Sequence, residues 1–311
     1  MATGYLARIA GVPAGVRAKV VDGYVRMWTQ VAPTNTVVVL DYRGAPYLRF
    51  SPAGVQVNHN SEMFYLNMTP VPVPPPAHLT PTTPPHWALV STGHSYEWHD
   101  GRLQALASVA LAPGTRYVGR WSIPLRIGDR AAAISGGLWH APRPSPVWFW
   151  PIAVVLLCVL AGWRVRNDNL DALLVRALAW TALLGSVVAA VGLELHGRPG
   201  IPAFHFVVLA VVLAFCGWGI SRLLRQPPGW FGYFAIASVA IWEGANLVPT
   251  LLNPFVLISL PGALARIASV VCLSAGIGLL PLVFRLGARA AGEEEPEEES
   301  LEEIVGRELR A

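Results

Sequence analysis

The chain has 311 residues, of which 53% are hydrophobic and only 14% are charged. Soluble domains carry about 25% charged residues, so this composition excludes a wholly soluble protein and predicts one that lies in a lipid bilayer. The net charge of +4 comes from arginines that flank loops. No basic patch is interleaved with aromatic residues, which argues against nucleic acid as a partner.

Residues 1–145 have the pattern of an all-β domain, in which short runs of Val, Tyr, Trp and Leu are separated by Gly, Pro and Asp. The predicted strands are Tyr24–Val31, Thr36–Tyr42, Pro46–Phe50, Gly54–Asn58, Ser95–His99, Arg102–Leu111, Tyr117–Pro124 and Ala131–His140. They predict a seven- or eight-stranded antiparallel sandwich of the cupredoxin or immunoglobulin-like type.

Two segments of this domain have turn or loop composition. The dipeptide Asp100-Gly101 favours a type I′ turn, which predicts a tight hairpin over Tyr96–Leu106. The proline-rich stretch 70–85 is incompatible with a sheet ladder, so we expect it to run over the surface as an extended loop.

The rules change after residue 146, where apolar stretches of about 20 residues follow one another, the length that a hydrocarbon core requires. They predict a domain of five transmembrane helices over 146–285, at 147–163, 173–193, 203–223, 230–252 and 262–284. Arginines concentrate after the first, third and fifth spans. The positive-inside rule therefore places the C-terminus in the cytoplasm and the β domain outside a bacterial cytoplasmic membrane.

Both ends of the chain carry further expectations. An outer β domain needs a secretion signal, and MATGYLARIAGV lacks the charged and apolar regions of one, so we expect processing or a start upstream. Residues 286–311 form an acidic tail with nine Glu. A capping-box pattern at Ser300 and Glu303 predicts a short helix there that docks on a cytoplasmic partner.

Histidines are concentrated in the β domain and suggest a metal site. Imidazole binds copper and zinc, and the candidate ligands are His59, His86, His94 and His99. Because alternate residues of a strand point to opposite faces, His94 and His99 do not converge without a bulge, and one of them needs a partner such as His59 or His86. The alternative is that these histidines are structural or lie at the surface.

A second candidate site lies in the membrane half, where an ionisable side chain costs about 2.5–3.5 kcal/mol on insertion scales. Its members are Glu194, His196, His205, Glu243, Asn246 and Arg266. They predict a polar pocket in the outer half of the bilayer, a metal path, or a haem site with His196 and His205 as ligands. The alternative is a Glu243–Arg266 pair that fixes helix register.

Three stretches, Val37–Asn67, Trp87–Leu103 and Trp121–His140, resemble a family of uncharacterised actinobacterial membrane proteins. The resemblance covers nearly the whole chain and implies a secreted β domain followed by a helical membrane half. It implies no activity. The resemblance implies a histidine in many relatives where this sequence has Gln104; if that histidine is a metal ligand, its absence here counts against a metal site. More loosely, the order of parts is similar to that of copper-resistance proteins that join a copper-binding sandwich to membrane helices, an analogy of fold alone.

These observations favour a non-enzymatic membrane protein that binds or handles a ligand, with copper as the named candidate, at the outer membrane face. The first alternative is a non-catalytic accessory subunit that associates with partner membrane subunits. The second is a membrane oxidoreductase that uses a metal or haem. The motifs GxSxG, HExxH, the P-loop and GxGxxG after a strand are absent from the sequence, so no catalytic residue is assigned.

Overall fold

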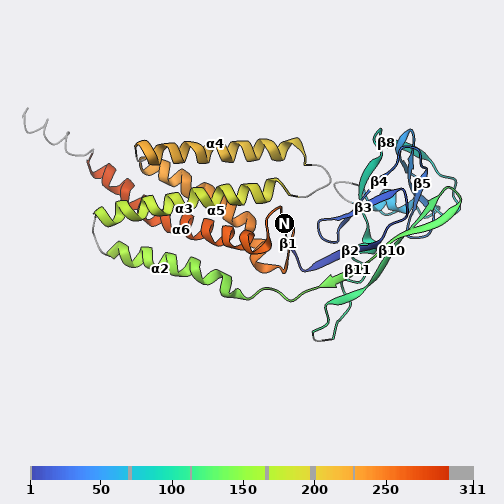
Figure 1. Cartoon of the computed structure of the whole chain (residues 1–311), viewed down its shortest axis with the longest axis horizontal. Helices are drawn as coiled ribbons and strands as arrows, with labels where there is room; N and C mark the ends of the chain where they lie inside the picture. The colour runs from blue at the N-terminus through green and yellow to red at the C-terminus, as the bar shows by residue number, and fades with distance from the viewer. Residues whose placement is uncertain are drawn as a thin grey trace, which may run out of the picture. The chain divides into compact units, whose positions relative to one another are not determined.

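The computed structural model describes residues 2–68, 72–112, 114–164, 168–196, 201–226 and 228–293 (Figure 1). Its internal contacts divide the chain into a β unit, Ala2–Arg143, and a helical unit that begins at Pro144. This division confirms the prediction of an N-terminal all-β region and a C-terminal helical half. The acidic residues 294–311 and the capping-box helix predicted there lie outside the described residues.

The β unit consists of two antiparallel sheets. Seven strands form one sheet in the order β2-β11-β10-β5-β6-β7-β8, and three strands form the other in the order β3-β4-β9. The ten strands of these sheets are β2 (Tyr5–Gly11), β3 (Val16–Val21), β4 (Arg26–Val31), β5 (Val37–Leu40), β6 (Pro46–Ser51), β7 (Gly54–Asn58), β8 (Trp87–Ser91), β9 (Ser95–His99), β10 (Tyr117–Ile127) and β11 (Arg130–His140). The two-residue strand β1 (Ala2–Thr3) belongs to neither sheet. Two short helices, α1 (Glu62–Leu66) and the 3₁₀ turn η1 (Gly101–Leu103), complete the unit.

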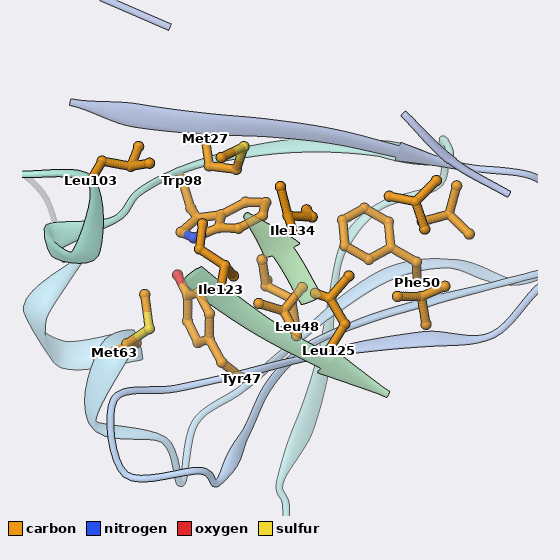
Figure 2. Close-up of a cluster of buried hydrophobic side chains, with 14 of the residues drawn as sticks. Met27, Tyr47, Leu48, Phe50, Met63, Trp98, Leu103, Ile123, Leu125 and Ile134 are labelled. Atoms are coloured by element: carbon orange, nitrogen blue, oxygen red, sulfur yellow. The ribbon is translucent and has the colours of Figure 1, made fainter. Parts of the chain in front are cut away.

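The two sheets share one hydrophobic core. Buried and less buried residues alternate along β4 and β5, as expected for strands with one face turned inward. Figure 2 shows Met27 and Trp98 of the three-stranded sheet packed over Ile123 and Leu48 of the seven-stranded sheet. The alternation that the sequence shows therefore defines the inner face of each layer.

The cupredoxin or immunoglobulin-like assignment is wrong in its finer detail. Such sandwiches divide their strands far more evenly between two sheets, whereas here the division is seven against three. The cause is the long β10–β11 hairpin, in which Ile127 pairs with Arg130 across the two-residue turn Gly128-Asp129. Gly128 has a φ of 56°, a value that glycine adopts without strain in such tight turns. Strands β2, β3 and β8 are not among the strands predicted from the sequence.

The hairpin predicted over Tyr96–Leu106 is also wrong. Strand β9 ends at His99 and is followed by η1, and its partner is β4 rather than a return strand over Arg102–Leu111. Asp100 has a φ of −127°, which a type I′ turn does not allow. Its carboxylate is buried and accepts hydrogen bonds from Trp98 Nε1 at 2.9 Å and from Arg102 Nη2 at 2.7 Å. These hydrogen bonds hold the backbone at Asp100 in a conformation other than that of a type I′ turn.

The proline-rich loop is irregular over its described part, residues 72–85, as expected. It is not continuously extended, however. Main-chain hydrogen bonds from Leu79 to Pro76 and from Thr83 to Thr80 close two turns. Leu79 is buried, so its apolar side chain fixes one of these turns against the unit.

The helical unit contains a short 3₁₀ turn, η2 (Pro146–Phe149), five helices and the two-residue strand β12 (Phe255–Val256) between the last two helices. The helices are α2 (Trp150–Arg164), α3 (Asp168–Glu194), α4 (Ala203–Arg225), α5 (Trp230–Leu252) and α6 (Gly262–Glu293). Among the described residues, four helices, α3 to α6, are long and apolar enough to cross a membrane.

The prediction of five spans is therefore corrected to four. The predicted first span, 147–163, corresponds to α2, which has 15 residues and a length of about 22 Å at 1.5 Å per residue. A hydrocarbon core is about 30 Å thick, so α2 is too short by this criterion. Apolar composition alone did not reveal that Pro146–Phe149 would form a separate 3₁₀ turn. At the other end, α6 continues nine residues past the predicted limit of 284 to Glu293.

Helix α6 lies at the centre of the bundle and packs against α2, α3 and α5. Glycines allow the close approach of α5 and α6: a Cβ atom on Gly276 would lie 2.9 Å from the Ala237 carbonyl oxygen. Small residues at helix contacts are typical of membrane bundles. Closer to the C-terminal end of α6, Arg285 forms a buried ion pair with Asp171 of α3, with a separation of 3.2 Å. These contacts fix the helices that surround the site described next.

Candidate functional site

The four histidines predicted as metal ligands do not gather at one place in the β unit. The rings of His59 and His86 are adjacent, with centroids 5.3 Å apart, and His59 stacks on Phe64. His94 precedes β9 and His99 is its last residue. At about 3.3 Å per residue, these two positions are about 16 Å apart along the chain. The structure thus brings together His59 with His86, but not His94 with His99.

The surroundings of these side chains are those of structural or surface residues. His99 is exposed and lies 3.4 Å from the Gln104 side chain. Met27 and Met63, the sulfur-bearing side chains of β4 and α1, are fully buried in the core. Within the described residues, no group of three or more His, Cys, Asp or Glu side chains is arranged to hold a metal ion.

The second predicted cluster surrounds a cavity of about 680 Å³ in the helical unit. Its walls come from the C-terminal end of α3, the first half of α4 and residues 238–249 of α5. Five of the six cluster residues contribute to its lining: Glu194, His196, His205, Glu243 and Asn246. The sequence placed these groups at similar depth, and the helices bring them to one space.

Two residues of the lining, His205 and Glu194, form a pair. Nδ1 of His205 lies 2.5 Å from Oε2 of Glu194, which joins the beginning of α4 to the end of α3. His196 follows α3 directly and lines the same region. Hydrogen bonds between helix ends fix their geometry in a bilayer, where water does not compete. This pair therefore holds α4 against α3 at one edge of the cavity.

Glu243 lies deeper. It is nine residues before the end of α5, or about 14 Å along the helix axis, and only 4% of its surface is exposed. Among the described residues, no hydrogen bond or ion pair reaches its carboxyl group. Asn246, one turn further along α5, lines the cavity beside it. A buried carboxyl group without a partner is costly, which makes Glu243 a candidate binding group.

The predicted Glu243–Arg266 pair is not formed. Nε of Arg266 donates a hydrogen bond to the Thr250 carbonyl oxygen at 2.9 Å, and its Nη2 reaches the carbonyl oxygens of Asn253 and Pro254. These carbonyl groups lack partners because α5 ends there, and arginine commonly satisfies such groups. Arg266 therefore caps α5 and does not line the cavity.

The apolar walls of the cavity were not predicted from the sequence. Phe204, Val208 and Val212 of α4 face Val239 and Trp242 of α5 across the cavity. A signal for the α4 wall was present, because residues 204, 205, 208 and 212 recur at the i, i+1, i+4 and i+8 spacing of one helix face. The other faces of α4 are also apolar, however, so this spacing does not distinguish the cavity-lining face from the rest of the helix.

Comparison of the chain with protein-family models, with curated proteins and with solved structures found no match. The resemblance to actinobacterial membrane proteins therefore stays a prediction from the sequence.

Proposed function

We propose that this chain is a multi-pass membrane protein that binds a small ligand in the cavity between α3, α4 and α5. The observation that carries the proposal is the buried carboxyl group of Glu243, which faces this cavity and lacks a partner among the described residues. A protein tolerates such a group inside a bilayer mainly where it has a function.

The cavity has the composition of a ligand site. Small-molecule sites measure about 300–1,000 Å³ and combine apolar walls with a few polar groups that orient the ligand. The volume of about 680 Å³ lies within this range. The aromatic and aliphatic side chains of α4 and α5 provide the walls, and Glu243, Asn246 and the His205–Glu194 pair provide the polar groups.

We place the cavity in the outer half of the membrane, with the β unit outside. Because α3 to α6 are an even number of spans, this placement requires that η2 and the short apolar helix α2 together carry the chain across the bilayer to Arg164. The chain enters the helical unit through η2, where Trp148 lies beneath the Arg266 guanidinium at 6.0 Å from its ring centroid, so η2 adjoins the end of α5 that borders the cavity. The opposite end of the bundle contains the arginines at 164, 176, 222, 225 and 285. By the positive-inside rule, that end is cytoplasmic.

The orientation has a direct test because Lys19, exposed on β3, is the sole lysine of the chain. A membrane-impermeant amine-reactive biotin should label intact cells that express the protein, and Lys19→Arg should lose the label that depends on this side chain. Labelling that requires permeabilised cells would instead place the β unit in the cytoplasm.

The binding proposal is tested by a pair of α4 variants. Val208→Trp fills the cavity, whereas Ala210→Trp adds the same side chain on the opposite face, since two residues of a helix are about 200° apart; Ala210 is exposed and does not line the cavity. Native mass spectrometry of protein extracted with its surrounding lipid should show a retained small molecule in the parent and in Ala210→Trp. Val208→Trp should lose it. Equal retention by both variants would contradict the proposal.

A further inference from the structure

We infer that the ligand is an amphiphile with a protonated amine head and an apolar body, and that it enters the cavity sideways from the bilayer between α4 and α5. This inference rests on the proposed function, since it names the class of ligand for the same cavity. Three features of the described residues support it: the opening between α4 and α5, the acidic side chains of the lining, and its apolar side chains.

The opening lies at membrane depth. Helix α4 packs mainly on α3, whereas α5 packs on both α3 and α6, so α4 and α5 form two walls that do not close on each other. Phe204 on α4 and Trp242 on α5 line the cavity and are nevertheless 70% and 69% exposed. Along α5 the lining extends from Pro249 to Ser238, about 4 to 21 Å from the end of the helix. A membrane-dissolved molecule has access to this depth.

The charge of the lining is acidic. Glu194 and Glu243 contribute carboxyl groups, and the described lining contains no lysine or arginine. The carboxyl group of Glu194 already has a hydrogen-bond partner, the ring of His205. Glu243 is therefore the group that has still to be paired, and a charged carboxylate away from water is stabilised most by a cation that also donates hydrogen bonds. A protonated amine meets both requirements, and the Asn246 side chain offers an amide oxygen beside it.

The apolar part of the lining explains why the ligand needs an apolar body. Val208, Val212 and Val239 line the same cavity as Glu243, and so do the exposed side chains of Trp242 and Phe204. An amine that pairs with Glu243 thus leaves its remaining atoms against aliphatic and aromatic side chains. Aromatic rings also attract cations at their faces. A small hydrated cation would leave this apolar surface without contacts, which disfavours it.

The experiment uses three photoreactive probes that share one alkyl chain with a diazirine and differ in the head group. The heads are a primary ammonium, an alcohol and a sulfonate. The full-length protein, in phosphatidylcholine nanodiscs, is irradiated with each probe, and the labelled peptides are identified by mass spectrometry. Normalising to labels on the lipid-facing side of α4, around Ala210, corrects for different partitioning of the probes into the bilayer.

The ammonium probe should label the cavity-lining residues of α4 and α5 about tenfold more than the alcohol or the sulfonate. A tenfold difference corresponds to the lower end of the free energy that a hydrogen bond to a charged group contributes. Glu243→Gln should reduce ammonium labelling to the level of the alcohol. Glu194→Gln, whose parent residue already has His205 as a partner, should have a smaller effect. The comparison of heads on the unaltered protein stands even if the Glu243 variant fails to fold.

The outcomes separate the two proposals. Equal labelling of the cavity by all three heads, unchanged in Glu243→Gln, would overturn the amine inference and leave a general ligand site in place. Stronger labelling by the sulfonate would overturn it as well. Cavity labelling that is absent for every probe in the parent, and no different in Val208→Trp, would overturn the proposed function itself.

Discussion

The most demanding structural prediction concerns Asp100→Ala in the β unit. The Asp100 carboxylate is fully buried and accepts bonds from Trp98 Nε1, from the Arg102 main-chain nitrogen at 3.1 Å, and from Arg102 Nε and Nη2 at 2.8 and 2.7 Å. Arg102 keeps its bond to the Leu40 carbonyl oxygen at 2.9 Å and its position over the Tyr42 ring. Removing one partner of a buried ion pair costs about 3–5 kcal/mol. The retained contacts of Arg102 favour the lower half of that range.

Hydrogen exchange measured by mass spectrometry on the full-length protein in nanodiscs reports this loss. The slowest amides of β4, β9 and β10 should exchange about 100- to 1,000-fold faster in Asp100→Ala, since every 1.4 kcal/mol is a factor of ten. Asp129→Ala is the matched control because Asp129 is an exposed acid in the β10–β11 turn. A change of less than threefold in Asp100→Ala, similar to that of the control, would refute the assignment of this ion pair as a major source of stability.

Two further predictions address the other contacts. Gly276→Ala should lower the melting temperature of the helical unit in detergent, because the new methyl group would overlap the Ala237 carbonyl oxygen and overpacking costs about 1–3 kcal/mol. Gly217→Ala is the control, because the space around Gly217 is open, and it should leave the melting temperature unchanged. Equal effects of the two variants would contradict the close packing of α5 and α6. Burial raises the pKa of the Glu62 carboxyl group above its ordinary value of 4.5, against the opposing charge of Arg43. The folded state then binds more protons, so the contribution of Glu62 to stability is lost as the pH rises through this raised pKa. The stability of the parent relative to Glu62→Gln, followed by hydrogen exchange, should therefore fall as the pH rises above about 4.5; a rise would refute the assigned direction.

The sequence predicts the architecture well where a single physical rule decides the outcome. Helix α5 begins and ends at the predicted residues, Trp230 and Leu252, because its apolar run is bounded on both sides by Gly or Pro and polar residues. Strand β9 also has its predicted bounds. In both cases local hydrophobic pattern and local chain breakers agree, so tertiary contacts have little to change.

The failures occur where tertiary contacts override local signals. Asp100-Gly101 has the sequence of a tight turn, but Trp98 and Arg102 bind its carboxylate and impose a different backbone. Conversely, the true tight turn, Gly128-Asp129, has one of the dipeptides that favour hairpins and was overlooked in favour of the first. Short-range chemistry did not distinguish the two sites.

The candidate site shows the same limit. Helical spacing and hydropathy predicted that Glu243, Asn246 and the histidines near α3 and α4 would share one membrane depth. The identity of the partners required the structure: Arg266 binds carbonyl groups at the end of α5, and His205 binds Glu194. A sequence indicates depth in the membrane, but the rotation of each helix depends on packing.

The central claim, a ligand site between α4 and α5, is tested most directly by the mass of the protein extracted with its native lipids. We predict that the parent and Ala210→Trp each retain a small molecule and that Val208→Trp does not, with all three equally folded. A parent that retains nothing, or a Val208→Trp variant that retains the same molecule, would contradict the account.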